Sequence, residues 1–384
     1  MIYLDNAATS FPKPEPVYAA LDRFARTSLA NPGRAGHRMA VAAERTLDET
    51  RHLLNQFFGG EAPQRWILTL NCTDALNLAI KGVLRPGDHV VTTDLEHNSI
   101  SRPLRALEKA GVISLSRVAS KDGYVDAQSI GEAMNSRTAL VAMTHASNVL
   151  GTVQPVESIA PLVRKAGALF LLDAAQSAGV VPIDLRTMPI DLLAFPGHKA
   201  LYGPTGTGAL YAGPRTDGRI RPWREGGTGG DSSSETQPVL LPYLLEGGTP
   251  NVLGAAGLSA GITWVNERGS ESLRAHEVGL LTKVVEWAEH SNGWRIAGRW
   301  DPATHVGALS LVPPPGLSPQ DLGSILDVSF DIAVRPGLHC APYIHRAIGT
   351  FPEGTLRLSP GPFTQPSDID RLLEALEEIT MGVL

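Results

Sequence analysis

Residues 169–176 read LFLLDAAQ and residues 192–206 read LLAFPGHKALYGPTG. Each stretch opens with an apolar run of the length of a buried strand. The first run ends at the acid Asp173, and the second leads into a turn that carries Lys199. A pyridoxal phosphate (PLP) site needs such a pair, because a lysine forms the Schiff base and a carboxylate keeps the pyridine nitrogen protonated. Taken alone, the two residues fit a loop acid and a surface lysine equally well.

Strand-like and helix-like segments alternate from about residue 66 to residue 211. This alternation predicts an α/β fold with a mainly parallel sheet, whose ligand site lies at the carboxyl ends of its strands. We expect strands at residues 66–70, 89–93, 113–116, 139–144, 169–172 and 192–195, and helices at residues 74–83 and 156–166. The side chains at or just beyond the strand ends are Thr73, His97, Asn148, Asp173 and Lys199.

After residue 211 the alternation of strand-like and helix-like segments is less regular. The polar segment 226–235 predicts a surface loop or hairpin. A helical stretch is expected from residue 251 toward 291, and a smaller strand-and-helix unit should follow it. Its expected elements are strands at residues 306–312 and 332–334 and a last helix at residues 368–381, with Ser367 as the N-cap.

Composition narrows the class of protein. A length of 384 residues suggests two domains, or one large domain with an appendage. A net charge of -6 without a basic cluster argues against a nucleic-acid partner. No apolar run approaches the ~20 residues of a membrane span, and Asp5 comes too early for a signal peptide. The two cysteines are too far apart for a CxxC metal site, so we expect no metal and a cytoplasmic location.

Short motifs along the whole chain occur in a specific order. They read MIYLDNAAT at 1–9, NCTDALN at 71–77, EHN at 96–98, THASNVLG at 144–151, DAAQ at 173–176, GHK at 197–199, GTPN at 248–251 and RPGLHCA at 335–341. This order closely resembles the class V aminotransferase group of fold-type I PLP enzymes, and within it the cysteine desulfurases and selenocysteine lyases. The resemblance implies a large PLP-binding domain over residues 16–255 with a mainly parallel sheet of the seven-stranded type. It also implies a smaller α+β domain over residues 256–384, on which residues 1–15 pack.

The resemblance also gives roles to the residues around the cofactor ring. Lys199 would bind PLP, and Asp173 would pair with the pyridine nitrogen. Gln176 would hydrogen-bond the phenolic oxygen, and His97 would stack on the ring and transfer protons. Asn148 would contact both cofactor and substrate.

At the phosphate end, Thr73 lies in a strand-to-helix turn, where backbone N–H groups favour an anion. The same geometry also suits a helix N-cap. His198 is the second phosphate candidate. Thr249 would reach the phosphate of a partner subunit in a homodimer, although it also reads as a turn residue before proline. The family usually has Ser or Thr where Pro196 stands, so either PLP binds more weakly or another group compensates.

At the sulfur end, Cys340 lies in a pattern close to that of group II desulfurases, where a thiolate attacks the substrate sulfur. Arg357, in GTLRLS at 354–359, matches the arginine that binds the substrate carboxylate. A further polar set, Asn31, Arg34 and His37, resembles loosely a segment that approaches the substrate. Cys72 receives no role.

The leading interpretation is a PLP-dependent cysteine desulfurase that converts L-cysteine to L-alanine and leaves a persulfide on Cys340. A sulfur-acceptor protein would take that sulfur. Selenocysteine lyase is a neighbouring alternative, and transamination or another C–S cleavage on the same fold is a third. A non-enzymatic sulfur-transfer scaffold is a fourth, disfavoured by the presence of Asp173, Lys199 and Arg357 together.

Overall fold

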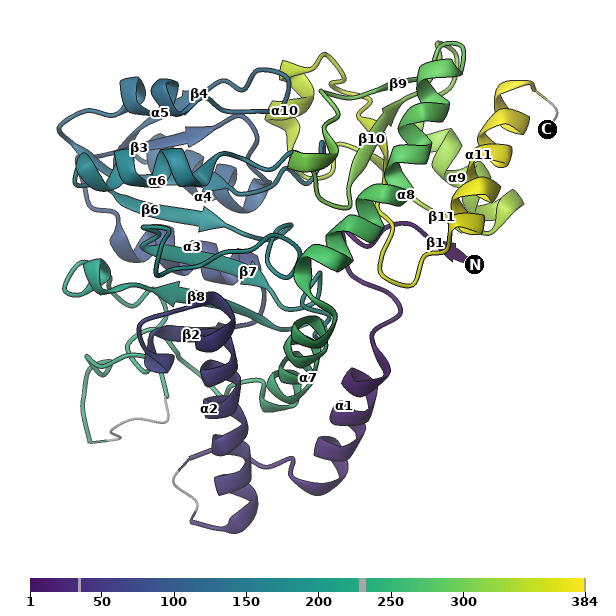
Figure 1. Ribbon diagram of the computed structural model, residues 1–384. Coiled ribbons are helices and arrows are strands. Elements are labelled where there is room, and N and C mark those ends of the chain that lie inside the picture. The colour runs from purple at the N-terminus through teal and green to yellow at the C-terminus, as the bar shows by residue number, and fades with distance from the viewer. Residues whose placement is uncertain (34–35, 228–232, 383–384) are drawn as a thin grey trace.

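A seven-stranded sheet forms the centre of the larger part of the molecule (Figure 1). The structure is a computed structural model and describes residues 1–33, 36–227 and 233–382. The strand order is β2-β8-β7-β6-β5-β3-β4, and β8 alone runs antiparallel to its neighbours. This confirms the predicted mainly parallel α/β sheet. The strands are β2 (Trp66–Thr69), β3 (Asp88–Thr93), β4 (Ile113–Val118), β5 (Thr138–Thr144), β6 (Leu169–Asp173), β7 (Leu192–Pro196) and β8 (Gly208–Ala212).

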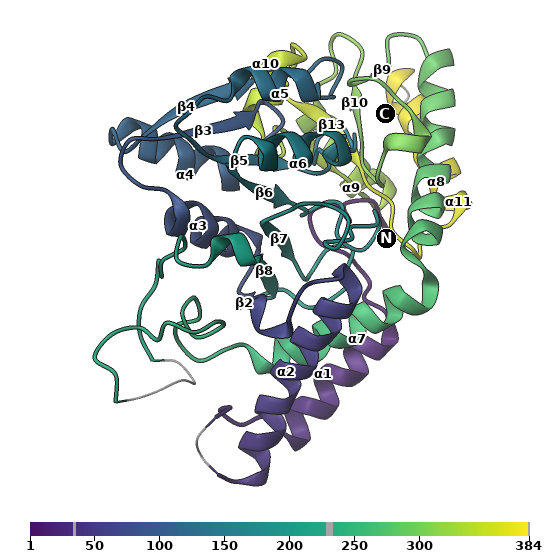
Figure 2. The same cartoon turned by 60° about the vertical axis from the view of Figure 1, so that its left-hand side comes forward.

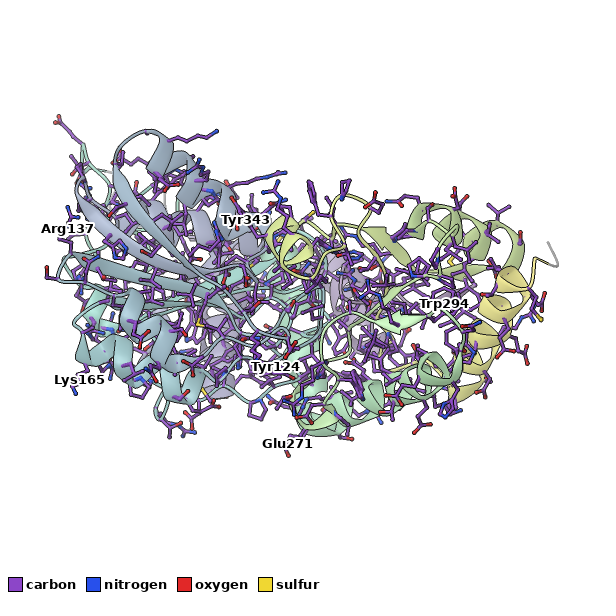
Figure 3. All side chains as sticks on the ribbon, turned by 90° about the horizontal axis from the view of Figure 1, so that it is seen from above. Tyr124, Arg137, Lys165, Glu271, Trp294 and Tyr343 are labelled. Atoms are coloured by element: carbon purple, nitrogen blue, oxygen red, sulfur yellow. The ribbon has the colours of Figure 1, made fainter. Side chains whose placement is uncertain are left out.

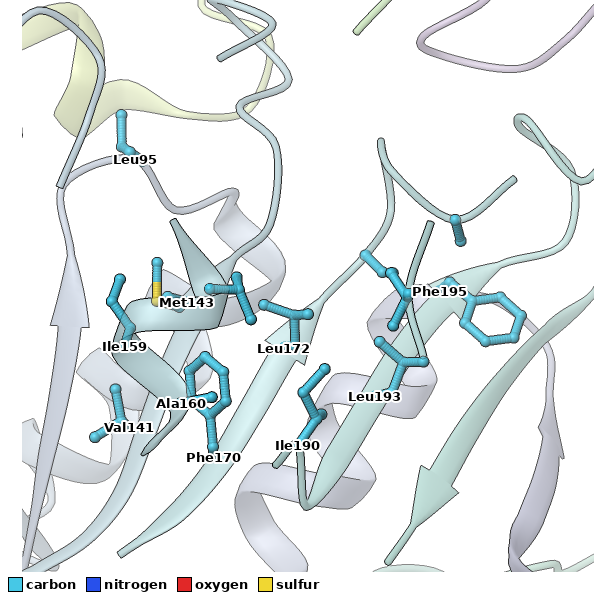
Figure 4. Close-up of a cluster of buried hydrophobic side chains, with 14 of the residues drawn as sticks. Leu95, Val141, Met143, Ile159, Ala160, Phe170, Leu172, Ile190, Leu193 and Phe195 are labelled. Carbon is cyan, nitrogen blue, oxygen red and sulfur yellow. The ribbon is translucent and has the colours of Figure 1, made fainter. Parts of the chain in front are cut away.

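The central strands are apolar on both sides because helices cover both faces of the sheet. Phe170 and Leu172 of β6 pack with α6 on one face, together with the end of α2 (Figure 4). Leu169 and Leu171 point the other way and pack with α3 and α4. These helices are α2 (Arg38–Phe58), α3 (Cys72–Val83), α4 (Asn98–Lys109), α5 (Ala127–Ala133) and α6 (Val156–Lys165).

The first residues of the chain join the C-terminal part of the molecule. β1 (Ile2–Tyr3) pairs in parallel with β11 (Ile332–Ala333). A four-stranded sheet in the order β12-β13-β10-β9 lies beside this pair. The elements here are α8 (Ser270–His290), β9 (Arg295–Ile296), β10 (Leu309–Val312), α9 (Pro319–Phe330), β12 (Arg335–Gly337), α10 (Pro342–Ala347), β13 (Thr355–Leu358) and α11 (Pro366–Thr380).

Helix α7 (Val252–Arg268) packs against both α1 (Glu15–Thr27) and α2 (Figure 2). Because α7 runs across residues 255 and 256, the expected domain boundary falls inside a helix, and the boundaries remain a prediction. Short 3₁₀ turns occur at Pro63–Arg65, Pro214–Thr216 and Pro302–Thr304. Within the described residues, no helix is both long and apolar enough to span a bilayer.

Some expected boundaries were wrong. Ser367 is not the N-cap of the last helix, because Pro366 already occupies its first position and Gln365 precedes it, with its N–H donating to Asp368. The helical stretch after Asn251 is two helices that meet at Gly269, whose φ of 81° breaks the first. The strand expected from residue 306 begins only at Leu309. The predicted loop at 226–235 falls partly on residues 228–232, outside the described residues, and its described flanks form neither helix nor strand.

Candidate active site

Most of the predicted site residues line one cavity at the carboxyl edge of the large sheet. The ends of β3, β5, β6 and β7 meet there, as parallel strands require. The cavity has a volume of about 160 Å³. The predicted residues in its wall are Thr73, His97, Asn148, Asp173, Gln176, His198 and Lys199.

Asp173 is a buried carboxylate whose Oδ1 already has partners. The Ala175 N–H donates to Oδ1 at 2.9 Å, and the Cys72 thiol donates to the same oxygen at 3.4 Å. Burial raises the pKa of Asp173, while the Ala175 N–H and the Lys199 charge oppose that rise. Oδ2 accepts no hydrogen bond from the described residues, so this oxygen is available to a cationic N–H donor in the cavity.

Lys199 is buried in the turn that follows β7. Burial lowers the pKa of its amine to about 8, and the Arg357 charge acts in the same direction. Because this pKa is close to neutral, a substantial fraction of the amine is uncharged and nucleophilic.

The N-terminal segment holds this turn in place. The Ser10 hydroxyl donates to the Lys199 carbonyl at 2.9 Å, and the Lys13 ammonium donates to the His198 carbonyl at 2.7 Å. Thr9 Oγ1 lies 3.1 Å from Nδ1 of His198. Sequence reasoning missed Ser10 and Lys13, because no local pattern links them to a turn that lies almost 190 residues away.

The start of α3 supplies donors at one end of the cavity. Asn71 is the N-cap, with its side chain accepting from the Asp74 N–H, so the N-cap alternative for Thr73 was wrong. Thr73 Oγ1 lies 2.7 Å from Oγ of Ser99, at the start of α4. Ser99 also lines the cavity and was missed, although it follows a strand end just as His97 does. Hydroxyls beside a helix N-terminus suit a phosphate, and Ser99 is a candidate for the hydroxyl that Pro196 lacks.

His97 is neutral, and its hydrogen bonds define its tautomer. Burial and then the Lys199 charge lower its pKa to about 4. The Ser99 backbone N–H donates to Nδ1 at 3.1 Å, so Nδ1 is an acceptor and the ring proton lies on Nε2. The Ser99 hydroxyl, 2.8 Å from the same nitrogen, fixes the ring further.

Arg357 of β13 is almost fully buried and links the two parts of the molecule. Its Nη2 contacts Asp5 Oδ1 at 2.6 Å, and its Nη1 donates to the Asn148 carbonyl at 3.0 Å. Its Nε has no partner among the described residues. Asn148 in turn donates from Nδ2 to the His339 carbonyl at 2.6 Å. The guanidinium therefore lies close to a cavity residue and retains a free donor.

Cys340 is exposed, and its backbone is held tightly. The Asn98 N–H donates to the Cys340 carbonyl at 2.7 Å, and Nη2 of Arg335 lies 3.8 Å from Sγ. His339 and Cys340 have φ angles of 47° and 59°, an uncommon left-handed pair for residues other than glycine. The thiol thus belongs to a short ordered loop beside the His97 turn, although it is not part of the cavity wall.

Other predicted residues lie elsewhere or have other partners. Thr249 is exposed and lines a different cavity, so its predicted role depends on a second subunit. Gln176 lines the cavity but donates to the Ala7 carbonyl. Asn31 lies outside the cavity, His37 caps α2, and Arg34 lies outside the described residues.

These groups fit PLP. The free oxygen of Asp173 faces a cavity that also holds a buried amine of lowered pKa. The start of α3, with the Thr73 and Ser99 hydroxyls, gives a phosphate site in the same wall. The cavity wall thus offers Asp173 to the ring nitrogen, Lys199 to the aldehyde and the start of α3 to the phosphate.

Comparisons of sequence and of structure with known proteins all point to one family. Residues 2–372 match the family model of class-V aminotransferases. A probable cysteine desulfurase of Methanothermobacter thermautotrophicus is 35% identical, covering 98% of this chain and 94% of that protein. One from Pyrococcus abyssi is 34% identical, covering 100% and 95%. The apo structure of a cysteine desulfurase from Thermococcus onnurineus superposes with a TM-score of 0.92 at 32% identity, covering 99% of this chain and 95% of that one. The chain therefore belongs to the PLP-dependent class-V aminotransferase family, alongside its cysteine desulfurases.

Proposed function

We propose that this protein is a cysteine desulfurase that converts L-cysteine to L-alanine and retains the sulfur as a persulfide on Cys340. The observation that carries the proposal is an exposed cysteine whose carbonyl accepts from Asn98 and whose thiol contacts Arg335. Asn98 follows His97, which lines the same cavity as Asp173 and Lys199. The names of the relatives support the same substrate.

The residues present have distinct tasks in holding the cofactor. Asp173 would accept the pyridine N–H, and Lys199 would hold the aldehyde carbon. Thr73, Ser99 and the start of α3 would bind the phosphate, and the neutral His97 ring would pack against the cofactor ring. When bound, PLP withdraws electrons from the substrate carbon skeleton and so makes the Cα proton acidic.

The remaining residues would act on the substrate. Arg357 would bind its carboxylate, using a planar fork suited to two oxygens. The Lys199 amine, once free, would take the Cα proton, because its pKa of about 8 suits a base near neutral pH. The Cys340 thiolate would then attack the substrate sulfur, and an S–S bond would form while the C–S bond breaks. The electron pair of the broken bond stays with the carbon skeleton, and protonation at carbon yields alanine.

We further propose that the active form is a homodimer in a reducing cytoplasm. Exposed apolar side chains, Trp223, Val239 and Leu240, lie in the segment that leads to Thr249, which supports a partner surface there. The two cysteines are both free thiols, which suits a reducing compartment.

A substrate panel tests the proposal. Cysteine, selenocysteine and alanine are supplied separately with excess dithiothreitol, and alanine, pyruvate and sulfide or selenide are quantified. We expect equal amounts of alanine and sulfide from cysteine, and none from a Lys199→Ala variant. Release from selenocysteine alone would instead support a lyase, and conversion of alanine to pyruvate would support transamination.

A further inference from the structure

Arg335 contacts the Cys340 thiol, and four more arginines lie on the elements around the loop that carries it. We call this group the arginine rim and define it as Arg102, Arg105, Arg117, Arg335 and Arg346. The rim draws on α4 and β4 from one part of the sequence and on β12 and α10 from another. In Figure 1, α10 lies at the top, between the large sheet and the C-terminal part.

The loop that carries Cys340 fixes the position of α4 in the rim. The N–H of Asn98, the first residue of α4, donates to the Cys340 carbonyl. Arg102 and Arg105 follow at four and seven residues, so they lie on the same helix face as Asn98. Both are exposed, and the Arg102 charge is close enough to lower the pKa of His97. Arg335 reaches the thiol itself at 3.8 Å.

Tyr343 of α10 joins the remaining arginines to this group. The guanidinium of Arg117 lies 3.8 Å from the centre of the Tyr343 ring. Arg346 lies 5.7 Å from the same ring and 4.6 Å from the exposed ring of Phe351. Stacking of this kind holds guanidinium groups in place without using their N–H donors. One donor of Arg117, on Nη1, is already used, because it donates to the Thr93 carbonyl at 2.7 Å.

Most of this positive charge is uncompensated. Among ion pairs of the described residues, only Arg105 has a carboxylate partner, Glu108. The other four arginines have no carboxylate partner among the described residues, so the rim carries a net positive charge. Because the whole protein carries a net charge of -6, this basic patch has the opposite sign to the protein as a whole. It therefore favours partners whose contact surface is acidic.

We propose that the arginine rim docks a protein sulfur acceptor whose receiving cysteine lies in an acidic surface. This inference rests on the proposed function and adds the charge of the partner. In the transfer step, the acceptor thiolate attacks the outer sulfur of the Cys340 persulfide. A new S–S bond forms on the acceptor, the old S–S bond breaks, and Cys340 leaves as a thiolate next to Arg335.

Three synthetic peptides of equal length test the charge preference. Each has one central cysteine, flanked by Glu and Asp in the acidic peptide, by Ser and Gly in the neutral one and by Lys in the basic one. The PLP-loaded enzyme is first charged with cysteine, and mass spectrometry confirms the Cys340 persulfide. Sulfur transfer to each peptide is then timed at low and high salt, with dithiothreitol as an uncharged reference.

We expect the acidic peptide to accept sulfur roughly tenfold or more faster than the neutral one at low salt, with the advantage lost at high salt. Arg105→Glu combined with Arg346→Glu should remove the preference without changing transfer to dithiothreitol. The matched control is Arg137→Glu, an exposed arginine that Figure 3 labels away from Tyr343, and it should retain the preference.

Equal rates for the acidic and neutral peptides would overturn the proposal. A short RNA that blocks transfer while the peptides show no preference would overturn it too, and would assign the rim to nucleic acid. If no persulfide forms on Cys340, the proposed function fails instead, and this is seen before any peptide is added. Because the milder Arg346→Gln retains the size of the side chain, it separates loss of charge from damage to folding.

Discussion

Arg357→Lys tests how the substrate carboxylate is bound. The lysine retains the positive charge, but its single ammonium replaces a fork that already contacts Asp5 at 2.6 Å and the Asn148 carbonyl at 3.0 Å. The variant should therefore lose at least one charged hydrogen bond to the substrate, or about 1.5–3 kcal/mol. This loss corresponds to an increase in KM for cysteine of roughly 10- to 150-fold.

The assay follows alanine formation against cysteine concentration with excess dithiothreitol. Asp5→Asn is the matched control, because it removes the Asp5 charge from the same ion pair and leaves the guanidinium in place. Its KM should rise less than that of the lysine variant, while urea unfolding of both variants reports any loss of stability. A parental KM in Arg357→Lys, or equal increases in both variants, would refute this role.

Three other changes test the cofactor side of the site. Asp173→Asn should still bind PLP but lose at least about tenfold in turnover, the scale of one charged hydrogen bond, because an amide cannot stabilise the protonated ring nitrogen; parental turnover would rule out this role. Ser99→Ala should weaken PLP affinity by about 0.5–1.5 kcal/mol if its hydroxyl replaces the one that Pro196 lacks, and a fluorescence titration giving an unchanged Kd would show that it does not. Because burial depresses the pKa of Lys199 in the folded protein to about 8, the charged amine is disfavoured there, and the uncharged form prevails only above that pH. Capture of PLP by the cofactor-free protein should consequently speed up as pH rises through about 8, and a stopped-flow rate that stays flat across this range would contradict the assignment.

The sequence predicted the site residues that lie at or just beyond the ends of strands. The apolar runs before Asp173 and Lys199 end in a mainly parallel sheet, so their polar neighbours had to meet at one edge. Thr73, His97 and Asn148 reached the cavity for the same reason. Their roles toward PLP came from the resemblance and remain predictions.

Contacts between distant segments could not be predicted. The hydroxyl of Ser10 and the ammonium of Lys13 hold the Lys199 turn, and Asp5 pairs with Arg357 across 352 residues. Such contacts leave no periodic signal in either segment. Strand β8 was also missed, since a run of five residues that begins with glycine resembles a turn.

The origin of the transferred sulfur is tested most directly by peptide mass spectrometry after brief exposure of the PLP-loaded enzyme to cysteine. The account predicts one added sulfur on Cys340, alanine in equal amount, and neither product at the parental rate in Cys340→Ser. Sulfur found on Cys72 instead, or alanine made from cysteine at the parental rate by the serine variant, would contradict it.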